Sequence, residues 1–448
     1  MTEASRANAA AAAQPLFHRF RSSAGEHVLV VPYSRIFDIA TQDDESATDF
    51  AGLDLAAMVL AEPTYGEASL EDLTEPPPQS ISLNVSSSCN LTCGYCYAAR
   101  GSFGGAQPSP MDWPTARAAI DRLLADVDPS APITIGFLGG EPFVNRQLIH
   151  RAVTYAASQG ALNGLDIRFS VTTNATLLDS ADIALLREHP FAVTVSLDGI
   201  AGIHDRQRPR YGAGDGSWRA AVNRIAPLLA ASGRAKIAAR TTVTRASFDL
   251  TTMLATLAEL GFPDVGFAPL RVGPAGSGVL LDTDWPEYLA ALIAASRAEL
   301  KRFRRGLPMR LTNLVVALKQ LHRGAASPYP CGAGGGYFSV SARGRWYACH
   351  RAIGDPAYEL GSNAGLDPAR RREFVLRHHV HRQPECLKCW ARYLCSGGCH
   401  QEARARSTAS CDFIRGWLSF CLTAYCELGG ALPAGPTEGT AIPAEDRP

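Results

Sequence analysis

The sequence lacks any apolar run long enough to cross a lipid bilayer. Its first residues, "MTEASRANAAAAAQP", also lack the basic segment and the hydrophobic segment of a secretion signal. Lysine plus arginine and aspartate plus glutamate number 43 each, so no strong basic field favours nucleic acid or an acidic membrane surface. We therefore expect a cytoplasmic protein with neither a membrane nor a nucleic acid as partner. Disulfides are not expected in that compartment.

Cysteine is absent from residues 97–330 and gathered on either side of them. Of the 12 cysteines, three lie within residues 89–96 and nine follow residue 330. Clustered thiols in a reducing compartment favour metal binding or redox chemistry. With 448 residues, 46% of them hydrophobic, the chain has material for more than one packed core. The spacing therefore predicts two metal-binding regions on either side of a large cysteine-free core.

The core alternates short apolar strands with amphipathic helices. Strict alternation predicts parallel strands joined by right-handed crossovers, and six such units fit either a doubly wound sheet or a partial (β/α) barrel. The expected strands are 80–88, 132–142, 165–175, 191–199, 235–245 and 264–272, and the expected helices are 114–127, 146–158, 180–189, 217–232, 249–261 and 285–303.

Unusual residues follow the ends of the first four expected strands. The cysteine loop follows the first strand, "GGEP" (139–142) the second, "TTN" (172–174) the third and "SLDG" (196–199) the fourth. Because ligands bind at the carboxyl ends of parallel strands, we expect these motifs to meet at one edge of the sheet.

The first cysteine loop, "CNLTCGYCY", supplies Cys89, Cys93 and Cys96. A structural zinc site takes four protein ligands. A cubane iron–sulfur cluster has four irons that can each take a thiolate, so three thiolates leave one iron open to a small molecule. The alternative is a zinc loop completed by a distant ligand, or buried free thiols.

This loop resembles the Cys-x3-Cys-x2-Cys motif of the radical S-adenosylmethionine (SAM) enzymes, with an aromatic residue, Tyr95, before the last cysteine. The resemblance implies a partial (β/α)6, TIM-like barrel. It also implies a [4Fe–4S] cluster whose open iron chelates the amine and carboxylate of SAM. Cleavage of SAM then yields a 5′-deoxyadenosyl radical that abstracts hydrogen from a substrate.

Further positions match that family residue by residue. The resemblance assigns Gly139, Gly140 and Glu141 to the SAM amine. It assigns Ser196 and Arg208 to contacts with the same ligand, and the backbone of Tyr95 to the adenine end. Asn174 lies on the same edge without an assigned role.

The C-terminal region resembles the SPASM domain, which extends radical SAM enzymes that modify peptides and proteins. The matching pattern is Cys331-x12-Gly344-x4-Cys349, a gap, Cys386-x2-Cys389-x5-Cys395-x3-Cys399, a gap, and Cys411. The resemblance implies two auxiliary [4Fe–4S] clusters, one held by Cys386, Cys389, Cys395 and Cys411 and the other by Cys331, Cys349 and Cys399. We interpret Cys421 and Cys426 as buried thiols, with the alternative that one replaces Cys411. A zinc ribbon is the alternative to auxiliary clusters.

Two departures separate the chain from sulfatase-maturing relatives. Those relatives have a further cysteine between the positions of Cys331 and Cys349, where this chain has Tyr337 nearby. They also have an aspartate base directly after the second cysteine, where this chain has His350. Histidine can accept a proton near neutral pH, so we predict that His350 is catalytic. The alternative role is that of a hydrogen-bonding neighbour.

These features predict a peptide maturase that forms a thioether or carbon–carbon crosslink in a ribosomal precursor peptide or small protein, with flavodoxin or ferredoxin as reductant. "CHR" and "GGCH" resemble the maturases of quinohaem amine dehydrogenases. The alternatives are oxidation of a serine or cysteine to formylglycine, as in sulfatase maturation, and a non-catalytic iron–sulfur or zinc scaffold.

We divide the chain into five expected parts. These are a disordered tail (1–15), an N-terminal module that binds a peptide or partner (16–76), the radical SAM core (79–306), the SPASM domain (307–428) and a second disordered tail (429–448). Within the module, the sequence predicts two strands around a turn in 27–42 and a helix in 45–62.

Overall fold

The computed structural model describes residues 15–39, 74–103, 109–212, 216–324 and 326–430. Its centre is a curved sheet of six neighbouring parallel strands, in the order β4 to β9 along both the sheet and the chain. The strands are β4 (Ser80–Ser86), β5 (Ile133–Gly139), β6 (Ile167–Thr173), β7 (Phe191–Ser196), β8 (Lys236–Val243) and β9 (Asp264–Pro269).

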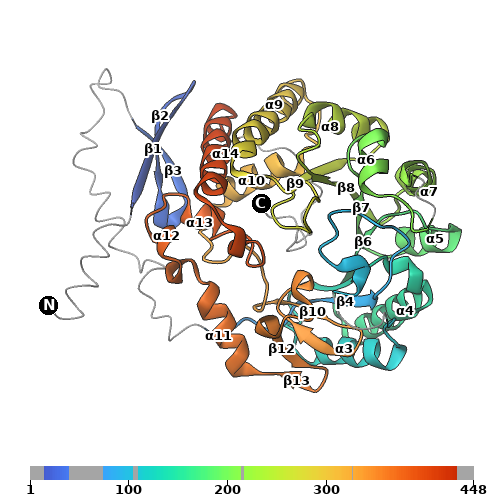
Figure 1. The fold of residues 1–448 in the computed structure, drawn as a ribbon. Coiled ribbons are helices and arrows are strands. Elements are labelled where there is room, and N and C mark those ends of the chain that lie inside the picture. The colour runs from blue at the N-terminus through green and yellow to red at the C-terminus, as the bar shows by residue number, and fades with distance from the viewer. Residues whose placement is uncertain (1–14, 40–73, 104–108, 213–215, 325, 431–448) are drawn as a thin grey trace.

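Helices follow each of these strands and cover the outer face of the sheet (Figure 1). They are α3 (Trp113–Asp126), α4 (Arg146–Asn163), α5 (Ser180–Glu188), α6 (Ala201–Gln207) with α7 (Trp218–Ala230), α8 (Leu250–Glu259) and α9 (Trp285–Phe303). Aspartates begin three of them: the side chains of Asp112, Asp179 and Asp249 accept hydrogen bonds from backbone N–H groups of the first turn. The predicted partial (β/α)6 barrel is confirmed.

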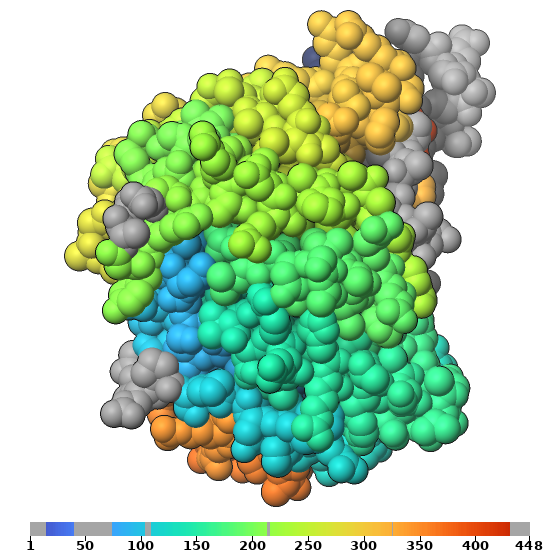
Figure 2. Space-filling view, turned by 90° about the vertical axis from the view of Figure 1, so that its right-hand side faces the viewer, coloured from blue at the N-terminus to red at the C-terminus, as the bar shows by residue number. Residues whose placement is uncertain are grey.

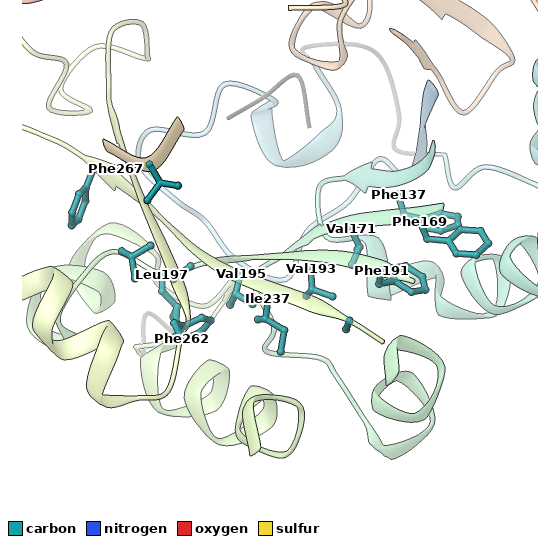
Figure 3. Packing of buried hydrophobic residues seen from close by; sticks show 14 of the residues in the cluster. Phe137, Phe169, Val171, Phe191, Val193, Val195, Leu197, Ile237, Phe262 and Phe267 are labelled. Atoms are coloured by element: carbon teal, nitrogen blue, oxygen red, sulfur yellow. The ribbon is translucent and has the colours of Figure 1, made fainter. Parts of the chain in front are cut away.

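The core lies between the strands and the outer helices. Phe137, Phe169 and Phe191 sit on neighbouring strands, with ring centroids 6.4 Å apart for the first pair and 5.2 Å for the second (Figure 3). All three are almost fully buried. The helices above them form the continuous outer face that Figure 2 shows in cyan to green.

Small polar residues occupy the opposite, inner face of the sheet. A Cβ added to Gly136 of β5 would lie 2.8 Å from Ser170 Oγ of β6 and 3.1 Å from Ser82 Oγ of β4. Successive strand residues point to opposite faces. The alternation therefore places the phenylalanines toward the helices and leaves an open, polar interior.

The cysteine-rich segment extends this same sheet. Strand β10 (Tyr337–Val340) pairs in parallel with β4, and three antiparallel strands continue outward from it. These are β11 (Arg345–Tyr347), β12 (Glu359–Ser362) and β13 (Gly365–Leu366). The sequence did not predict this pairing, which gives a ten-stranded sheet.

Helices of the cysteine-rich segment then return to the open side of the barrel. They are α11 (Pro368–His378), α12 (Pro384–Leu387), α13 (Arg392–Cys395) and α14 (Thr408–Glu427), preceded in the chain by α10 (Thr312–Arg323). Helix α14 packs against α9 and α10 (Figure 1). The cysteine-rich segment therefore contacts strand β4 at one end of the six-stranded sheet and the helices that follow β9 at the other.

An antiparallel sheet near the N-terminus lies beside α14 (Figure 1). Its strands are β1 (Phe17–Ser22), β2 (Gly25–Val30) and β3 (Arg35–Ile39). Strand β1 was not predicted; its His18 ring stacks on Trp390, with centroids 3.8 Å apart and planes 3° from parallel. The helix expected at 45–62 and most of both expected tails lie outside the described residues.

Among the helices in the described ranges, we find none with the length and apolar character needed to cross a membrane.

We predict that Phe169→Ala lowers the free energy of unfolding by about 3–5 kcal/mol, because it opens a cavity among the stacked rings. Chemical denaturation of the anaerobic protein measures the change. Leu162→Ala on α4 is the matched control, since Leu162 is 78% exposed and its truncation should change stability by less than about 0.5 kcal/mol. Equal effects of the two substitutions would contradict the assignment of the core.

Candidate functional site

One cavity of about 660 Å³ opens at the carboxyl ends of the barrel strands and beneath the cysteine-rich segment. Every site residue predicted from the sequence lines it. These are Cys89, Cys93, Tyr95, Cys96, Gly139, Gly140, Glu141, Ser196, Arg208, Cys331, Cys349, His350, Cys386, Cys389, Cys395, Cys399 and Cys411. Residues more than 300 positions apart in the chain therefore share one chamber.

The first cysteine loop is held by the end of α6 and the residues that follow it. The backbone N–H groups of Thr92 and Gly94 donate to the carbonyl oxygens of Pro209 (2.9 Å) and Gln207 (3.2 Å). At the other side of the loop, Asn174 Nδ2 lies 3.8 Å from Cys89 Sγ. The two backbone hydrogen bonds fix the loop, and its three thiols line the cavity.

Two glycines let the end of β5 approach this loop closely. A Cβ on Gly139 would lie 2.3 Å from Ser86 O, and a Cβ on Gly140 would lie 2.3 Å from both Ser88 O and Arg100 O. Gly139 also has φ = 149°, which side chains disfavour. The "GG" of the motif is therefore required by backbone packing against the cysteine loop.

Glu141 follows these glycines and is 1% exposed. Its Oε1 accepts hydrogen bonds from Thr173 Oγ1 (2.6 Å) and Phe143 N (3.2 Å), and its Oε2 accepts one from Asn174 N (2.8 Å). Burial raises the pKa of this carboxyl to about 7, although the hydrogen bonds act in the opposite direction. A cationic group in the cavity would favour the ionised form.

Arg208 forms a buried ion pair with Asp198. Its Nε and Nη2 donate to Oδ2 (2.9 Å) and Oδ1 (3.1 Å) of Asp198, which is fully buried. The Tyr95 hydroxyl donates to the same carboxylate. Burial raises the pKa of Cys93 to about 11, and the Arg208 charge opposes that shift. Arg208 thus lies close to the first thiol set while it bonds to Asp198.

Ser196 ends β7 and lies in register with Arg240 of β8. Both residues line the cavity and are partly exposed. Ser196 therefore lies at the strand end where the sequence predicted it.

The thiols fall into three electrostatically coupled sets. Burial raises the pKa of Cys89 most, and the charges of Cys93 and Cys96 raise it further. Burial likewise raises the pKa of Cys349, with the charges of Cys399 and Cys331 adding to it. Burial raises the pKa of Cys395 to about 12, with contributions from the charges of Cys386, Cys389 and Cys411. These are the three sets that the resemblance implies as cluster ligands.

Arginines accompany the two C-terminal sets. Arg406 Nη1 lies 3.6 Å from Cys386 Sγ, and the backbone N–H of Arg351 donates to Cys349 Sγ at 3.4 Å. The positive charge of Arg406 lowers the pKa of both Cys386 and Cys395 against the effect of burial. Cationic side chains here favour thiolates, the form that binds metal.

Cys421 and Cys426 lie outside the cavity lining. Cys421 is fully buried within α14. Burial raises the pKa of Cys426 most, and the negative charge of Asp38 on β3 raises it further. Their surroundings are those of packed thiols.

The donor sets fit iron–sulfur clusters. Each set is made only of thiols and faces a shared cavity. Across the described ranges, no three His, Cys, Asp or Glu side chains are placed to hold a single metal ion. In a cubane each thiolate binds a different iron, so the sulfurs need not converge on one point.

His350 and Tyr337 form a buried polar pair on the cavity wall. The Tyr337 hydroxyl donates to Ser82 Oγ (2.9 Å) and lies 3.1 Å from His350 Nδ1. Burial lowers the pKa of His350 to about 3, and the charges of Arg351 and Arg240 add to that effect. His350 is therefore neutral at pH 7, and Tyr337 is directed toward it.

Sequence reasoning missed two residues of this site, Asp198 and Glu402. Asp198 stands inside "SLDG", but its pairing with Tyr95 and Arg208 depends on how the chain folds back. Glu402 binds Arg351 at 2.6 Å and lies 3.4 Å from Arg271. The signal for Glu402 was its place three residues after Cys399, on the turn that also carries that thiol.

A profile of the Radical SAM superfamily matches residues 83–231. The serine-type anaerobic sulfatase-maturating enzyme of Klebsiella aerogenes is 26% identical over 336 residues, which cover 70% of this chain and 78% of that protein. An uncharacterized protein of Methanocaldococcus jannaschii is 37% identical over 127 residues, 28% of this chain, and that match spans only 41% of its length.

Two solved structures share the fold. The structure of native anSMEcpe with bound AdoMet and Kp18Cys peptide has a TM-score of 0.66 at 20% identity and covers 79% of this chain and 99% of that one. Streptococcus suis SuiB bound to precursor peptide SuiA has a TM-score of 0.51 at 16% identity and covers 74% of each chain.

We predict that Arg208→Gln lowers the free energy of unfolding by about 3–5 kcal/mol, because it leaves Asp198 as a buried, unpaired carboxylate. Adding Asp198→Asn should restore much of that loss. Chemical denaturation of the anaerobic protein without SAM measures both. If Arg208 served only a bound ligand, the single substitution would leave this stability unchanged.

Proposed function

We propose that this chain, whose residues 83–231 match the Radical SAM superfamily, acts as a maturase that forms a thioether or carbon–carbon crosslink in a ribosomal precursor peptide or small protein. The observation that carries the proposal is the single cavity shared by three thiol sets from the barrel and the cysteine-rich segment. A reaction that joins two positions of a peptide needs a cavity that holds the peptide next to the barrel and to the cysteine-rich segment. We assign the electron supply to a flavodoxin or ferredoxin.

In this proposal Cys89, Cys93 and Cys96 hold the [4Fe–4S] cluster that binds SAM. When the cluster and SAM are both bound, they would supply a 5′-deoxyadenosyl radical that abstracts hydrogen. Glu141 would accept a hydrogen bond from the SAM amine. Burial raises the pKa of Glu141 to about 7, and the positive charge of that amine favours the ionised carboxylate. Gly139 and Gly140 keep that carboxylate close to the loop.

We assign Ser196 to a SAM contact and the Tyr95 backbone to the adenine end. Arg208 acts through Asp198 and positions Tyr95 within the loop, in addition to facing the cavity. The resulting network excludes water from the base of the first thiol set, since Asp198 is fully buried.

The auxiliary clusters belong to the two C-terminal sets. Cys386, Cys389, Cys395 and Cys411 would hold one auxiliary cluster through four thiolates, whereas Cys331, Cys349 and Cys399 would hold the other through three. Tyr337, near the place of the cysteine found in sulfatase-maturing relatives, bonds instead to Ser82. That arrangement leaves three cysteines in this set, and a substrate thiolate would be the further ligand that brings a sulfur for thioether formation.

His350 is the proposed proton acceptor. Because the Tyr337 hydroxyl donates to Ser82, the remaining bond to Tyr337 is donated by His350 Nδ1. Nε2 then carries the lone pair. Burial makes this imidazole a weak base, with a pKa of about 3, and a negative charge brought by the bound substrate would raise that pKa and let Nε2 accept a proton.

Oxidation of a serine or cysteine to formylglycine is the second candidate. The 336-residue similarity to a serine-type sulfatase-maturating enzyme favours it. Two departures favour the crosslink. His350 stands where those relatives have an aspartate base, and the chain lacks their further cysteine between the positions of Cys331 and Cys349.

We retain the division of the chain at residues 76–79 and 306–307, with 16–76 as a peptide- or partner-binding module. The peptides named in the anSMEcpe and SuiB structures support a peptide substrate for this enzyme.

The mass change together with the thiol and carbonyl content of the product separates the two reactions, because oxidation of serine to formylglycine also removes two hydrogens. We expect the anaerobic enzyme with SAM and dithionite to release 5′-deoxyadenosine and to convert a Cys-containing precursor into a product lighter by two hydrogens. Such a product loses one free thiol if a thioether forms, which iodoacetamide labelling and tandem mass spectrometry detect. A carbonyl that reacts with dinitrophenylhydrazine, with no linked residues, would instead identify formylglycine. Absence of 5′-deoxyadenosine would refute both.

We predict that Cys349→Ala removes about four irons from the anaerobically reconstituted protein, because the auxiliary cluster loses one of only three thiolates. Cys421→Ala is the matched control and should keep the full iron content. Iron analysis with Mössbauer spectroscopy measures both. Equal iron content in the two variants would contradict the ligand assignment.

A further inference from the structure

Glu402 joins two arginines on the wall of the cavity. Its Oε1 binds Arg351 at 2.6 Å, and its Oε2 lies 3.4 Å from Nε of Arg271. All three residues line the cavity, and their side chains are between 16% and 25% exposed. Because one carboxylate serves two guanidinium groups, the three side chains together carry one net positive charge. We call Glu402, Arg351 and Arg271 the Glu402 bridge.

The Glu402 bridge connects the two turns that carry thiols of the three-cysteine set. Arg351 lies two residues after Cys349, and its backbone N–H donates to Cys349 Sγ at 3.4 Å. Glu402 lies three residues after Cys399, and its backbone N–H donates to the Cys399 carbonyl oxygen at 3.1 Å. The ion pair between the two side chains therefore holds one turn against the other.

The Glu402 bridge also reaches both edges of the barrel. The Arg351 guanidinium lies over the ring of Tyr97, the last residue of the first cysteine loop, 5.1 Å from its centroid. Arg271 lies two residues beyond the end of β9. Its guanidinium lies over the rings of Trp285 and Phe413, 4.8 Å and 5.7 Å from their centroids. Aromatic faces on both sides of the cavity therefore hold these two positive charges in place.

We propose that the Glu402 bridge sets the reduction potential of the auxiliary cluster assigned to Cys331, Cys349 and Cys399. The inference rests on that proposed cluster and adds the residues that control its electron affinity. The potential of an iron–sulfur cluster depends on the charge around it and on hydrogen bonds to its sulfurs. The Glu402 bridge supplies both, through its three charged side chains and through the N–H group that Arg351 directs at Cys349 Sγ.

The sign of each contribution follows from electrostatics. Reduction makes a cluster more negative, so a nearby positive charge favours the reduced form and a nearby negative charge favours the oxidised form. The side chains of the Glu402 bridge are largely shielded from solvent, so water and salt screen them less than surface charges. Glu402 is a positioning residue in this arrangement, because it holds both arginines beside the thiols and offsets part of their charge.

The test measures the midpoint potential of this cluster in the anaerobically reconstituted holoenzyme by a redox titration followed by EPR. The relevant signal is the one that Cys349→Ala removes. Glu402→Gln removes a negative charge, so we expect the equilibrium constant for one-electron reduction to rise about tenfold, a shift of about +59 mV. Arg351→Gln removes a positive charge and should lower the same constant by a similar factor.

The double variant with both Glu402→Gln and Arg351→Gln should return the potential close to that of the unmodified enzyme, because the two charge changes cancel. Glu427→Gln is the matched control. It removes the same charge from an ion pair with Arg304 whose two members lie outside the cavity lining, and it should leave the potential unchanged. Iron content should equal that of the unmodified enzyme in all of these variants.

Opposite shifts in the two single variants distinguish a charge effect from a structural one. Shifts of the same sign, or an unchanged potential in both, would overturn the proposal. If Glu402→Gln loses the cluster, Arg271→Gln decides, because it leaves the 2.6 Å ion pair between Arg351 and Glu402 intact. A lower potential in Arg271→Gln supports the proposal, and an unchanged potential overturns it.

Failure of this proposal is distinct from failure of the cluster assignment. If Cys349→Ala kept its iron and every EPR signal, the assigned cluster itself would be refuted. An intact cluster whose potential does not respond to the Glu402 bridge refutes only the role given to these three side chains. Neither result bears on the peptide-modifying reaction, which 5′-deoxyadenosine release and analysis of the product test separately.

Discussion

The carboxylate of Asp198 is the point on which the active-site architecture depends. It accepts hydrogen bonds from the Tyr95 hydroxyl, from two nitrogens of Arg208 and from the backbone N–H of Thr242. These donors belong to the cysteine loop, the segment after α6 and strand β8. A fully buried ion is tolerated only where its lone pairs are satisfied in this way. The same bonds therefore fix the loop that carries the first thiols relative to the barrel.

Cluster binding requires the buried thiols to lose protons, and their burial opposes that ionisation. Burial raises the pKa of Cys89 and Cys395 to about 12, so these groups are neutral thiols in the metal-free protein at pH 7. Ligation requires thiolates and releases protons. Iron binding and the stability of the cysteine-rich segment are thus coupled, and the arginines beside the two C-terminal sets reduce the cost of the charge.

Local patterns predicted the six parallel strands, their helices and the gathering of the motifs at one edge. Apolar runs such as "ITIGFLG" and the glycines of "GGEP" are signals within a few residues, so they can be identified in a single sequence. The pairing of β10 with β4 and the position of β1 beside α14 depend on contacts between distant segments. No short pattern encodes them.

The same limit applied to the site. The motif at Arg208 indicated a ligand contact, but its bonds to Asp198 emerged only from the three-dimensional arrangement. Glu402 carries no motif at all, and only its ion pairs with Arg351 and Arg271 give it a place in the site.

The parallel pairing of β10 with β4 has a consequence for how the protein is made. Ser339 Oγ donates to Ser82 O, across 257 positions of the chain. During synthesis from the N-terminus, the exposed edge of β4 therefore waits for its neighbour until most of the polypeptide has left the ribosome. An uncovered strand edge is prone to pair with other chains. If iron reached the nascent barrel before β10 pairs with β4, the cavity that the thiol sets share would be incomplete. Assembly of the metal centres therefore follows synthesis of the cysteine-rich segment.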